Sequence, residues 1–303
     1  MRKPRALRRG ALLGIAAPGG PVNCEILQSG VSMLRAEGFE VYQRDDLLAC
    51  DGYLAGDDAR RASELMELVN NPEVDGIICA RGGYGCDRIL SMLDAGAFRQ
   101  AAKPLVGYSD VTALLLWQRR CAGLMGFHGP MLDHGADLSR ATLDHLIQQL
   151  TGEGTLPSTL PGRTLVGGRA TGRLIGGSLT LLAASIGSPW EIDTRGAILL
   201  IEDVGERPYR VDRMLQQLRA AGKFEGLAAV GVGTFEGCTD ERYPQPDVDT
   251  VIENALCPLD IPIVCDLPFG HVEPNYAWPL GGRATIDGTN GELQLLEWGV
   301  SRR

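Results

Sequence analysis

The sequence lacks the features of several common protein classes. Asp and Glu outnumber Lys and Arg by 38 to 29, which leaves a formal net charge of −9. A protein that binds nucleic acid needs a basic face to neutralise phosphates, so this balance argues against nucleic acid as a partner. No apolar run approaches the roughly 20 residues that span a bilayer, so the sequence also predicts no membrane insertion.

The eight cysteines form no C-x-x-C pair. Several lie inside apolar runs, as Cys79 does in "IICA", which is typical of free buried thiols in a reducing compartment. A basic leader, "MRKPRALRR", precedes the apolar residues 11–17, an order that secretory signals share. This apolar stretch is at the short limit for a signal and runs straight into "PGG", so we interpret it as a first core strand. These features predict a cytoplasmic protein.

Motifs for cofactors and metals are incomplete. In "ARGGYGCDRI", Arg88 stands where a dinucleotide-binding fingerprint needs its third glycine. Neither the Gly-Lys-Ser/Thr of a phosphate-binding loop nor an H-E-x-x-H motif occurs. His128, Asp133 and His134 form only a loose cluster, which is weak support for a metal site. We therefore expect no cofactor and no metal.

Short apolar runs alternate with amphipathic stretches in the first half of the chain. This alternation predicts an α/β domain with an open, doubly wound parallel sheet, whose ligands bind beyond the carboxyl ends of its strands. The expected strands are residues 12–16, 40–43, 76–80, 104–108 and 124–127. The expected helices are residues 24–37, 57–71, 87–93, 110–120 and 138–150.

Residues 151–169 are rich in Gly, Pro, Thr and Ser, the composition of a connector. We therefore expect a domain over residues 1–150, a linker over 151–169 and a second α/β domain over 170–303. The strands expected in the second domain are residues 172–175, 198–201, 228–233, 262–265, 284–287 and 292–296, and its helices are 178–186, 211–221 and 247–256.

Two serines lie at the junction of an expected strand and helix. Ser109, in "VGYSD", follows Gly107 and precedes a helix, as a nucleophile at a sharp turn would, although the second glycine of G-x-S-x-G is absent. A serine at such a place can equally be a helix N-cap. Ser178, in "IGGSL", has the same surroundings. The pattern alone does not choose between them, although Ser109 lies in the more regular sheet.

A serine nucleophile needs a base, usually histidine. His145 lies in an amphipathic helix and His134 in a polar loop. His128 follows a strand, and His271 lies in a long Pro/Gly/aromatic loop, "LPFGHVEPNYAWPLGG". Both of these are positions where catalytic residues are found, and the residues themselves do not separate His128 from His271.

The base in turn needs a carboxylate to orient it. Glu202 and Asp203 end the apolar strand "AILLI", where a carboxylate is partly desolvated yet can reach a cleft. Glu206 and Asp212 lie nearby among arginines, and surface ion pairs account for them equally well.

Seven blocks, in order along nearly the whole chain, resemble the LD-carboxypeptidase family, serine peptidases of the S66 type. The blocks are "APGGP", "RGGYG", "KPLVGYSDVTALL", "GFHGPM", "LIGGSLTLLAASIGSPWEID", "LLIEDVGERPYRVDRMLQQL" and "LPFGHVEPNYAWPLG". The resemblance implies a flavodoxin-like N-terminal domain, a smaller mixed α/β C-terminal domain, and a site formed where the two meet.

The resemblance also implies a Ser-His-Glu triad of Ser109, His271 and Glu202. The oxyanion donors would be backbone amides of Gly82 or Gly83 and of Asp110. Ser178 is then a helix cap.

The reaction that the resemblance implies is hydrolysis of an L,D-peptide bond, releasing the terminal D-alanine from muropeptide tetrapeptides during cell-wall recycling. Arg81 is our candidate for binding the substrate's terminal carboxylate, although a structural pairing with an acidic neighbour explains it as well. The implied assembly is a homodimer.

Two other functions stay open at this stage. A branch of the same family cleaves peptide-nucleotide antibiotics and tends to carry an extra loop with an aromatic residue that stacks on the base. No such insertion is obvious here, although Trp190 and Trp278 are available aromatic residues. The other alternative is a non-catalytic module that binds a ligand in the same cleft.

Overall fold

The computed structural model describes residues 1–133 and 138–302, so His134 lies outside the described residues. The chain divides into two compact units. Unit 1 comprises Met1–Gly154, Ala277–Pro279 and Trp298–Arg303, and unit 2 comprises Thr155–Tyr276 and Leu280–Glu297. The last third of the chain therefore contributes to both units.

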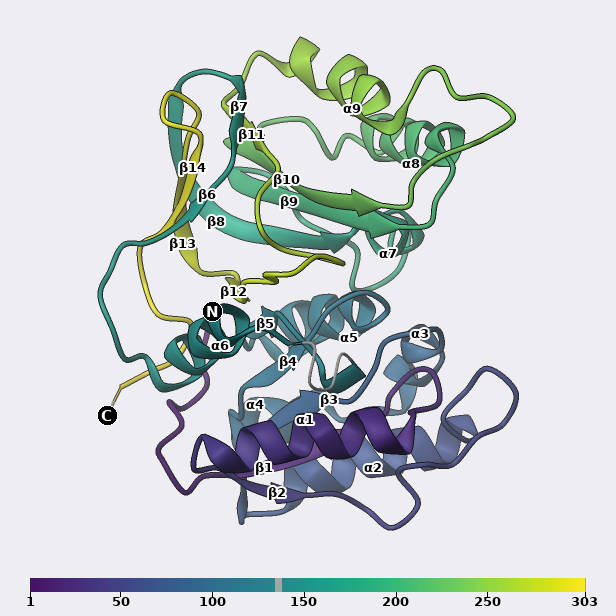
Figure 1. The fold of residues 1–303 in the computed structure, drawn as a ribbon, viewed down its shortest axis with the longest axis vertical. Helices are drawn as coiled ribbons and strands as arrows, with labels where there is room; N and C mark the ends of the chain where they lie inside the picture. The colour runs from purple at the N-terminus through teal and green to yellow at the C-terminus, as the bar shows by residue number, and fades with distance from the viewer. Residues whose placement is uncertain (134–137, 303) are drawn as a thin grey trace. The chain divides into compact units, whose positions relative to one another are not determined.

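Unit 1 is built on a six-stranded sheet with the order β12-β5-β4-β3-β1-β2 (Figure 1). The strands β1 to β5 pair in parallel and follow the order 2-1-3-4-5 of doubly wound, flavodoxin-like sheets. The predicted fold class is confirmed. The strands are β1 (Leu12–Ala16), β2 (Glu40–Tyr42), β3 (Val74–Cys79), β4 (Leu105–Gly107), β5 (Gly126–His128) and β12 (Trp278–Leu280).

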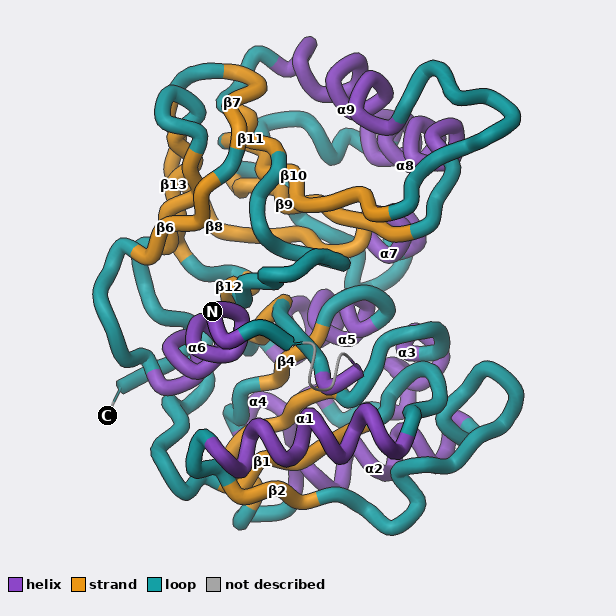
Figure 2. The backbone as a smooth tube through the Cα atoms, in the orientation of Figure 1, coloured by secondary structure: helices purple, strands orange, loops and turns teal. Residues whose placement is uncertain are grey.

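Helices cover both faces of this sheet (Figure 2). Leu13 and Ile15 of β1 share one apolar cluster with Leu27, on the face that the first and last helices of the unit cover. Gly14 points to the other face, where a Cβ would lie 2.7 Å from Leu68 Cδ2. The helices are α1 (Cys24–Ala36), α2 (Asp58–Asn70), α3 (Cys86–Ile89), α4 (Ala95–Ala101), α5 (Val111–Trp117) and α6 (Arg140–Thr151), with a 3-10 turn at Leu90–Met92 and a π-helical turn at Gln118–Ala122.

Unit 2 holds an eight-stranded mixed sheet with the order β6-β14-β13-β8-β9-β10-β11-β7. Its centre, β8 to β11, is parallel, and antiparallel strands flank it. The strands are β6 (Ser158–Pro161), β7 (Arg163–Val166), β8 (Arg169–Ser178), β9 (Ala197–Val204), β10 (Ala229–Glu236), β11 (Ile263–Cys265), β13 (Arg283–Asp287) and β14 (Glu292–Leu295). The helices are α7 (Leu179–Ala184), α8 (Pro208–Ala220) and α9 (Val248–Leu256), with a 3-10 turn at Cys257–Leu259.

The expected linker over residues 151–169 is not a plain connector. It contains β6 and β7, which form the two edges of the unit 2 sheet. An edge strand tolerates proline, and β6 ends at Pro161, opposite Glu292 of β14. The composition predicted a loop because the strands that pair with these segments, β14 and β11, come far later in the chain.

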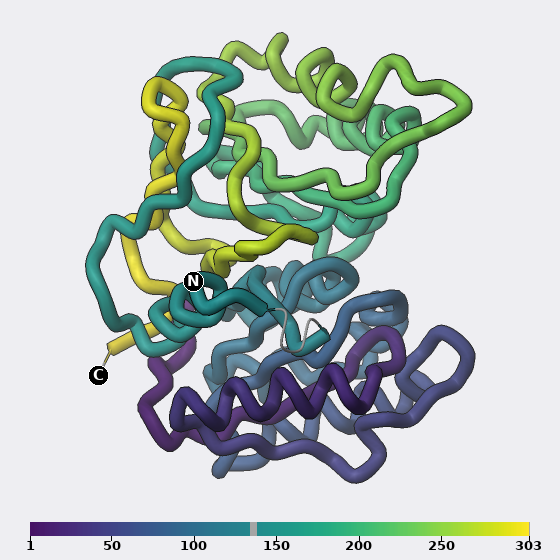
Figure 3. Tube along the Cα trace, viewed as in Figure 1, coloured from purple at the N-terminus to yellow at the C-terminus, as the bar shows by residue number. Residues whose placement is uncertain are grey.

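The two ends of the described chain lie side by side in unit 1 (Figure 3). The Ala6 N–H donates to the Ser301 carbonyl at 3.2 Å, and the Ser301 N–H donates to the Pro4 carbonyl at 2.8 Å. The basic leader is therefore part of the folded unit. Within residues 1–133 and 138–302, none of the helices has both the length and the apolar composition that a membrane span requires.

A buried carboxyl joins α2 to the end of β1. Glu64 is fully buried, accepts a hydrogen bond from the Ala17 N–H at 2.6 Å and pairs with the Arg60 guanidinium at 2.7 Å. Burial raises the pKa of Glu64 from 4.5 to about 7, and the charge of Arg60 offsets only part of that rise.

This raised pKa predicts a specific loss of stability as pH rises. Between pH 4.5 and about 7 the unfolded chain has lost this proton while the folded carboxyl keeps it, so the free energy of unfolding falls. The contribution is complete below pH 4.5 and lost above about 7, and its size is on the order of 3 kcal/mol. We expect the melting temperature of Glu64→Gln, measured by differential scanning fluorimetry, to depend less on pH in this window than that of the wild type.

Glu67→Gln, which removes an exposed carboxyl of the same helix, is the matched control and should leave the wild-type slope in place. Parallel pH profiles for wild type and Glu64→Gln would contradict the prediction.

Candidate functional site

Ser109 occupies a sharp turn between β4 and α5. Its φ is +57°, in the left-handed region that serine rarely adopts and that therefore carries backbone strain. Asp110, and not Ser109, holds the N-cap position of α5. An N-cap residue normally has extended backbone, so the strained Ser109 has the geometry of a nucleophile turn and not that of a cap.

The glycine turn after β3 packs directly against this serine. A Cβ on Gly82 would lie 3.1 Å from Ser109 Cβ, 3.3 Å from Ser109 Oγ and 3.2 Å from the Asp110 amide nitrogen. The Gly82 carbonyl accepts from the Gly20 N–H at 2.7 Å, and Gly83, with φ +80°, rests against Gly20. The loops after β1, β3 and β4 pack so closely here that only glycine leaves enough room at these positions.

The backbone N–H groups of Gly83 and Asp110, beside Ser109, are uncommitted among the described residues. In a trans peptide the C=O and N–H point in opposite directions, so the Gly83 N–H points away from Gly20, which the Gly82 carbonyl faces. Among the described residues, neither the Gly83 nor the Asp110 N–H donates to an acceptor. Both are therefore free to donate to a ligand.

A buried arginine and a buried carboxylate hold these loops together. Arg61 is fully buried, and its Nη1 donates to the carbonyls of Pro18 at 2.5 Å and Gly85 at 2.7 Å. The Asp110 carboxylate, 4% exposed, accepts from the Cys86 N–H at 2.8 Å. Burial raises the pKa of Asp110. The loops after β1, β3 and β4 thus form one cross-linked assembly.

Unit 2 contains a hydrogen-bonded carboxylate and imidazole. Glu202, near the end of β9, is fully buried, and its Oε2 lies 2.8 Å from His271 Nδ1. The His271 side chain keeps 19% of its surface exposed. When Glu202 is ionised, it accepts a hydrogen bond from the Nδ1–H of His271, which leaves Nε2 as the lone-pair nitrogen of the ring.

Gly270 makes this pair possible. With φ +101°, a Cβ at this position would lie 2.8 Å from both Cβ and Oε2 of Glu202. The Gly270 N–H donates to Asn275 Oδ1 at 3.1 Å, and Asn275 is 2% exposed, so the loop carrying His271 is tied back on itself. The glycine directly before the histidine in "FGHV" was the sequence signal for this contact.

The neighbouring residues of β8 and β9 have structural roles. Asp203 Oδ2 accepts from both the backbone N–H and the hydroxyl of Thr180, each at 2.8 Å, and so caps α7. Burial, together with the charge of Glu202, raises the pKa of Asp203 to about 6. Ser178 occupies the N-cap position of α7 with extended backbone, unlike Ser109, although its side chain makes no capping hydrogen bond.

The other histidines differ from His271. His128 is fully buried, stacked on Trp278 at 4.9 Å between ring centroids and edge-on to Tyr108 at 5.8 Å. Burial lowers the pKa of His145, on α6, to about 4. His128 was the alternative base that the sequence left open. Its ring is buried and packed between Trp278 and Tyr108.

Arg81 lies at the surface beside the glycine turn. Its guanidinium donates to the Pro21 carbonyl at 3.0 Å and pairs with no acidic side chain among the described residues. It borders a cavity of about 250 Å³ together with Asn23, Ile26 and the acidic Asp133. The expected residues are thus grouped by unit: Ser109, Gly82, Gly83, Asp110 and Arg81 lie in unit 1, and Glu202 and His271 lie in unit 2.

The contact between Gly270 and Glu202 predicts the effect of a single methyl group. Gly270→Ala should displace either the His271 loop or the Glu202 side chain, and so break the Nδ1–Oε2 hydrogen bond. We expect the downfield ring N–H resonance of His271 to disappear from the proton NMR spectrum and the melting temperature to fall.

Gly237→Ala is the matched control, because Gly237 also has positive φ, +63°, but its Cβ would meet nothing within 4 Å. A His271 resonance that persists in Gly270→Ala would contradict the role given to this glycine.

Comparison with known proteins places both units. Residues 13–129 match the family model described as the LD-carboxypeptidase N-terminal domain, and residues 171–286 match the LD-carboxypeptidase C-terminal domain. The probable murein peptide carboxypeptidase of Bacillus subtilis is 37% identical over 99% of this chain and 95% of its own length. The murein tetrapeptide carboxypeptidase of Pseudomonas aeruginosa is 31% identical over 91% of this chain and 93% of its own length.

Solved structures agree with this placement. The muramoyltetrapeptide carboxypeptidase from Oxalobacter formigenes superposes with a TM-score of 0.84 at 33% identity, covering 94% of this chain and 98% of that one. The microcin C7 self-immunity protein MccF, in complex with aspartyl sulfamoyl adenosine, superposes with a TM-score of 0.91 at 27% identity, covering 99% and 100% of the two chains. With both family domains matched in order and relatives aligned over nearly its whole length, this chain belongs to the LD-carboxypeptidase family of serine peptidases.

Proposed function

We propose that this enzyme releases the terminal D-alanine from muropeptide tetrapeptides, with Ser109 as nucleophile, His271 as base and Glu202 as the group that orients it. The observation that carries the proposal is the Glu202–His271 pair, a fully buried carboxylate bonded at 2.8 Å to a partly exposed imidazole. That pair is the orienting half of a serine-hydrolase triad. The triad takes its serine from unit 1 and the other two members from unit 2.

In this mechanism Ser109 Oγ attacks the carbonyl carbon of the L,D-peptide bond while His271 Nε2 takes the hydroxyl proton. Glu202 keeps the Nδ1 proton in place and stabilises the imidazolium. His271 then protonates the leaving D-alanine nitrogen as the C–N bond breaks. Water, deprotonated by the same imidazole, hydrolyses the acyl-enzyme and frees Ser109.

The oxyanion of each tetrahedral intermediate binds the amide of Gly82 or Gly83 and the amide of Asp110. Their lack of other acceptors, together with the close packing of Gly82 on Ser109, supports this role. Donors that are already in place at the developing charge are worth about 3 to 4 kcal/mol each in serine hydrolases. The strained φ of Ser109 supports the proposal in the same way, because it keeps Oγ beside these donors.

Arg81 is the proposed partner of the substrate's terminal carboxylate. Its guanidinium forms no ion pair among the described residues, although Asp133 lines the same cavity, and it lies on the glycine turn that carries Gly82 and Gly83. A guanidinium binds a carboxylate through two parallel hydrogen bonds, which suits an enzyme that removes only the last residue.

A muropeptide fits the chain better than a peptide-nucleotide. Trp278 is fully buried and stacked on His128, which removes it as a stacking partner for a nucleobase. Trp190 is half-buried in the turn after α7 and is the remaining aromatic candidate. The relatives named murein carboxypeptidases also align at higher identity, 37% and 31%, than MccF at 28%.

We extend the proposal to the setting of the reaction. The cysteines of the chain are all free, which supports a reducing compartment and hence the cytoplasm, where cell-wall peptides are recycled. A homodimer is the assembly that the family resemblance implies.

Mass spectrometry of D-alanine release from a muropeptide tetrapeptide tests the proposal. We expect turnover by the wild type and losses of at least about 1,000-fold in Ser109→Ala, His271→Ala and Glu202→Ala, because each removes a group that acts in the transition state. Ser178→Ala is the matched control and should retain near wild-type turnover. Unchanged turnover in Ser109→Ala would end the serine-peptidase mechanism, and preferred cleavage of an acyl-nucleotide would replace the substrate.

The clamp formed by Arg61 predicts an effect on the reactivity of Ser109. Arg61→Met removes both carbonyl contacts and should loosen the loops that carry the oxyanion donors. We expect kcat to fall at least about tenfold with little change in KM, and labelling of Ser109 by a fluorophosphonate to slow in proportion.

Arg88→Met is the matched control, since Arg88 pairs with the same Asp58 but contacts neither loop carbonyl. Equal losses in Arg61→Met and Arg88→Met would assign the effect to Asp58 and not to the loop clamp.

A further inference from the structure

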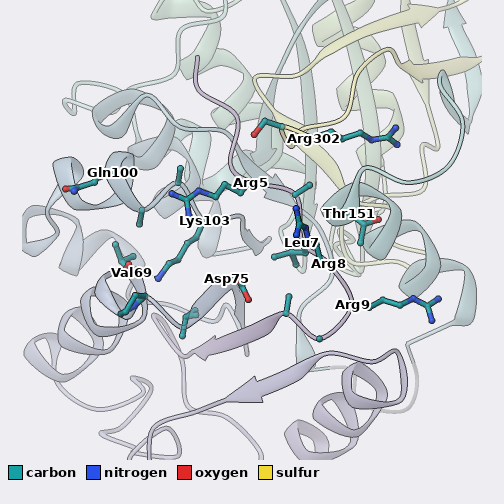
Figure 4. A pocket seen from close by; sticks show the side chains of 18 of the residues that line it. Arg5, Leu7, Arg8, Arg9, Val69, Asp75, Gln100, Lys103, Thr151 and Arg302 are labelled. Atoms are coloured by element: carbon teal, nitrogen blue, oxygen red, sulfur yellow. Dashed lines mark hydrogen bonds between the residues drawn. The ribbon is translucent and has the colours of Figure 1, made fainter.

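A basic pocket lies at one edge of the unit 1 sheet (Figure 4). It encloses about 840 Å³ and is lined by the start of the chain, the C-terminal ends of α2, α4 and α6, and the last described residues. Ala11 and Val74, at the beginnings of β1 and β3, border it. The pocket therefore lies at the amino ends of these parallel strands. Ser109 follows the carboxyl end of β4 in the same sheet, so the nucleophile lies at the other end of the strands.

Positive charge gathers at this pocket although the whole chain is acidic. The net charge of the chain is −9, yet cationic side chains around the pocket outnumber carboxylates by five to two. The cationic residues are Arg5, Arg8, Arg9, Lys103 and Arg302, and the acidic ones are Asp75 and Glu153. A concentration of one sign against the overall charge creates a local potential that attracts the opposite ion.

The leader that supplies three of these arginines is held in place by its backbone. The Arg5 N–H donates to the Ala102 carbonyl and the Leu7 N–H to the Leu150 carbonyl, both at 2.9 Å. The Leu7 side chain is 5% exposed and belongs to the apolar core of unit 1. The arginines therefore project from a segment that is already ordered. Binding of a ligand then costs less conformational entropy than it would with a flexible segment.

The C-terminus of α2 does not account for the arginines. The end of α2 is already neutralised by Lys103, whose ammonium donates to the carbonyls of Leu68, Val69 and Asn71 at 2.8, 2.8 and 2.6 Å. Those three bonds use all the donors of the lysine.

The guanidiniums themselves have no internal acceptor. The side chains of Arg5, Arg8 and Arg9 form no hydrogen bond or ion pair within residues 1–133 and 138–302. In Figure 4, Arg5 extends toward Lys103, while Arg9 and Arg302 extend outward on the other side.

The charges at the pocket repel one another. Burial lowers the pKa of Lys103 to about 8, and the charge of Arg5 adds to that lowering while Asp75 opposes it. The two carboxylates thus leave an excess of positive charge beside the cavity. An anion in the pocket would remove this repulsion.

We propose that the pocket binds a small phosphorylated molecule, through the guanidiniums of Arg5 and Arg8. The planar forks of arginine match phosphate oxygens in pairs. The volume falls within the range of about 300 to 1,000 Å³ typical of small-molecule sites. Asn70 and Gln100 line the same pocket and supply amides for the hydroxyls of a sugar or nucleoside. Because the pocket is remote from Ser109 along the strands, its ligand is distinct from the peptide that is cleaved.

Isothermal titration of the full chain with pyrophosphate and with glucose 6-phosphate tests this site. We expect binding at micromolar to submillimolar concentration that weakens as salt increases, and an accompanying rise in melting temperature. Arg5→Gln with Arg8→Gln should weaken binding at least about tenfold while D-alanine release without the phosphate compound stays at the wild-type rate. Arg8→Gln alone, a change at an exposed side chain, serves if the double variant does not fold, and should weaken binding by a smaller factor.

Arg195→Gln with Arg242→Gln removes the same charge from exposed positions of unit 2 and is the matched control, which should bind as wild type does. The proposal is overturned if millimolar pyrophosphate gives no binding, or if the control variant loses affinity equally. An equal rise in melting temperature with sulfate at matched ionic strength would assign the effect to charge screening. Tighter binding of polyglutamate than of pyrophosphate would replace the small molecule by an acidic protein segment.

Discussion

The close approach of the Gly270 backbone to Glu202 is the contact on which the proposed chemistry of unit 2 depends. A fully buried carboxylate is expensive unless it is hydrogen-bonded, and the His271 ring supplies that bond. The ring reaches it only because the preceding residue has no Cβ. Close packing continues along the loop, where a Cβ on Gly233 would lie 2.6 Å from the Phe269 carbonyl oxygen. One missing methyl group therefore lets a buried charge and a partly exposed base share a bond.

In unit 1 the proposed nucleophile depends on a strained backbone conformation that its surroundings hold in place. Ser109 is held in a left-handed conformation, and Gly82 allows the neighbouring loop to pack against it. The strain persists because the surroundings over-determine it: Arg61 ties two loops through their carbonyls, and the Asp110 carboxylate ties a third. The hydrogen bonds of Arg61 Nη1 and of the Asp110 carboxylate offset part of the desolvation cost of these buried groups while they fix the loop geometry.

The parts that could be predicted from the sequence share a local cause. The strand and helix periodicity of the first half identified β1, β3 and β4 and the doubly wound fold, because each parallel strand is buried on both faces and reads as an apolar run. Glu202 at a strand end and His271 in a Pro/Gly/aromatic loop were candidates on local grounds, although the residues did not separate His271 from His128. The pattern did not separate Ser109 from Ser178, and the φ values of +57° and −60° now distinguish them.

The parts that escaped prediction depend on partners that are distant in the chain. β6 and β7 read as a connector because their strand character comes from β14 and β11, and β12 read as a loop because its partner is β5. The sequence analysis assigned no role to Arg61, since only the fold brings Pro18 and Gly85 to its guanidinium.

By itself the sequence determined the composition of the proposed site, the fold class and the family, since these follow from local pattern and from ordered motifs. The tertiary structure alone decided which serine is strained, which histidine meets a carboxylate and where the basic leader lies. Each of those outcomes depends on contacts between segments far apart in the chain, and a linear pattern does not encode the distance between them.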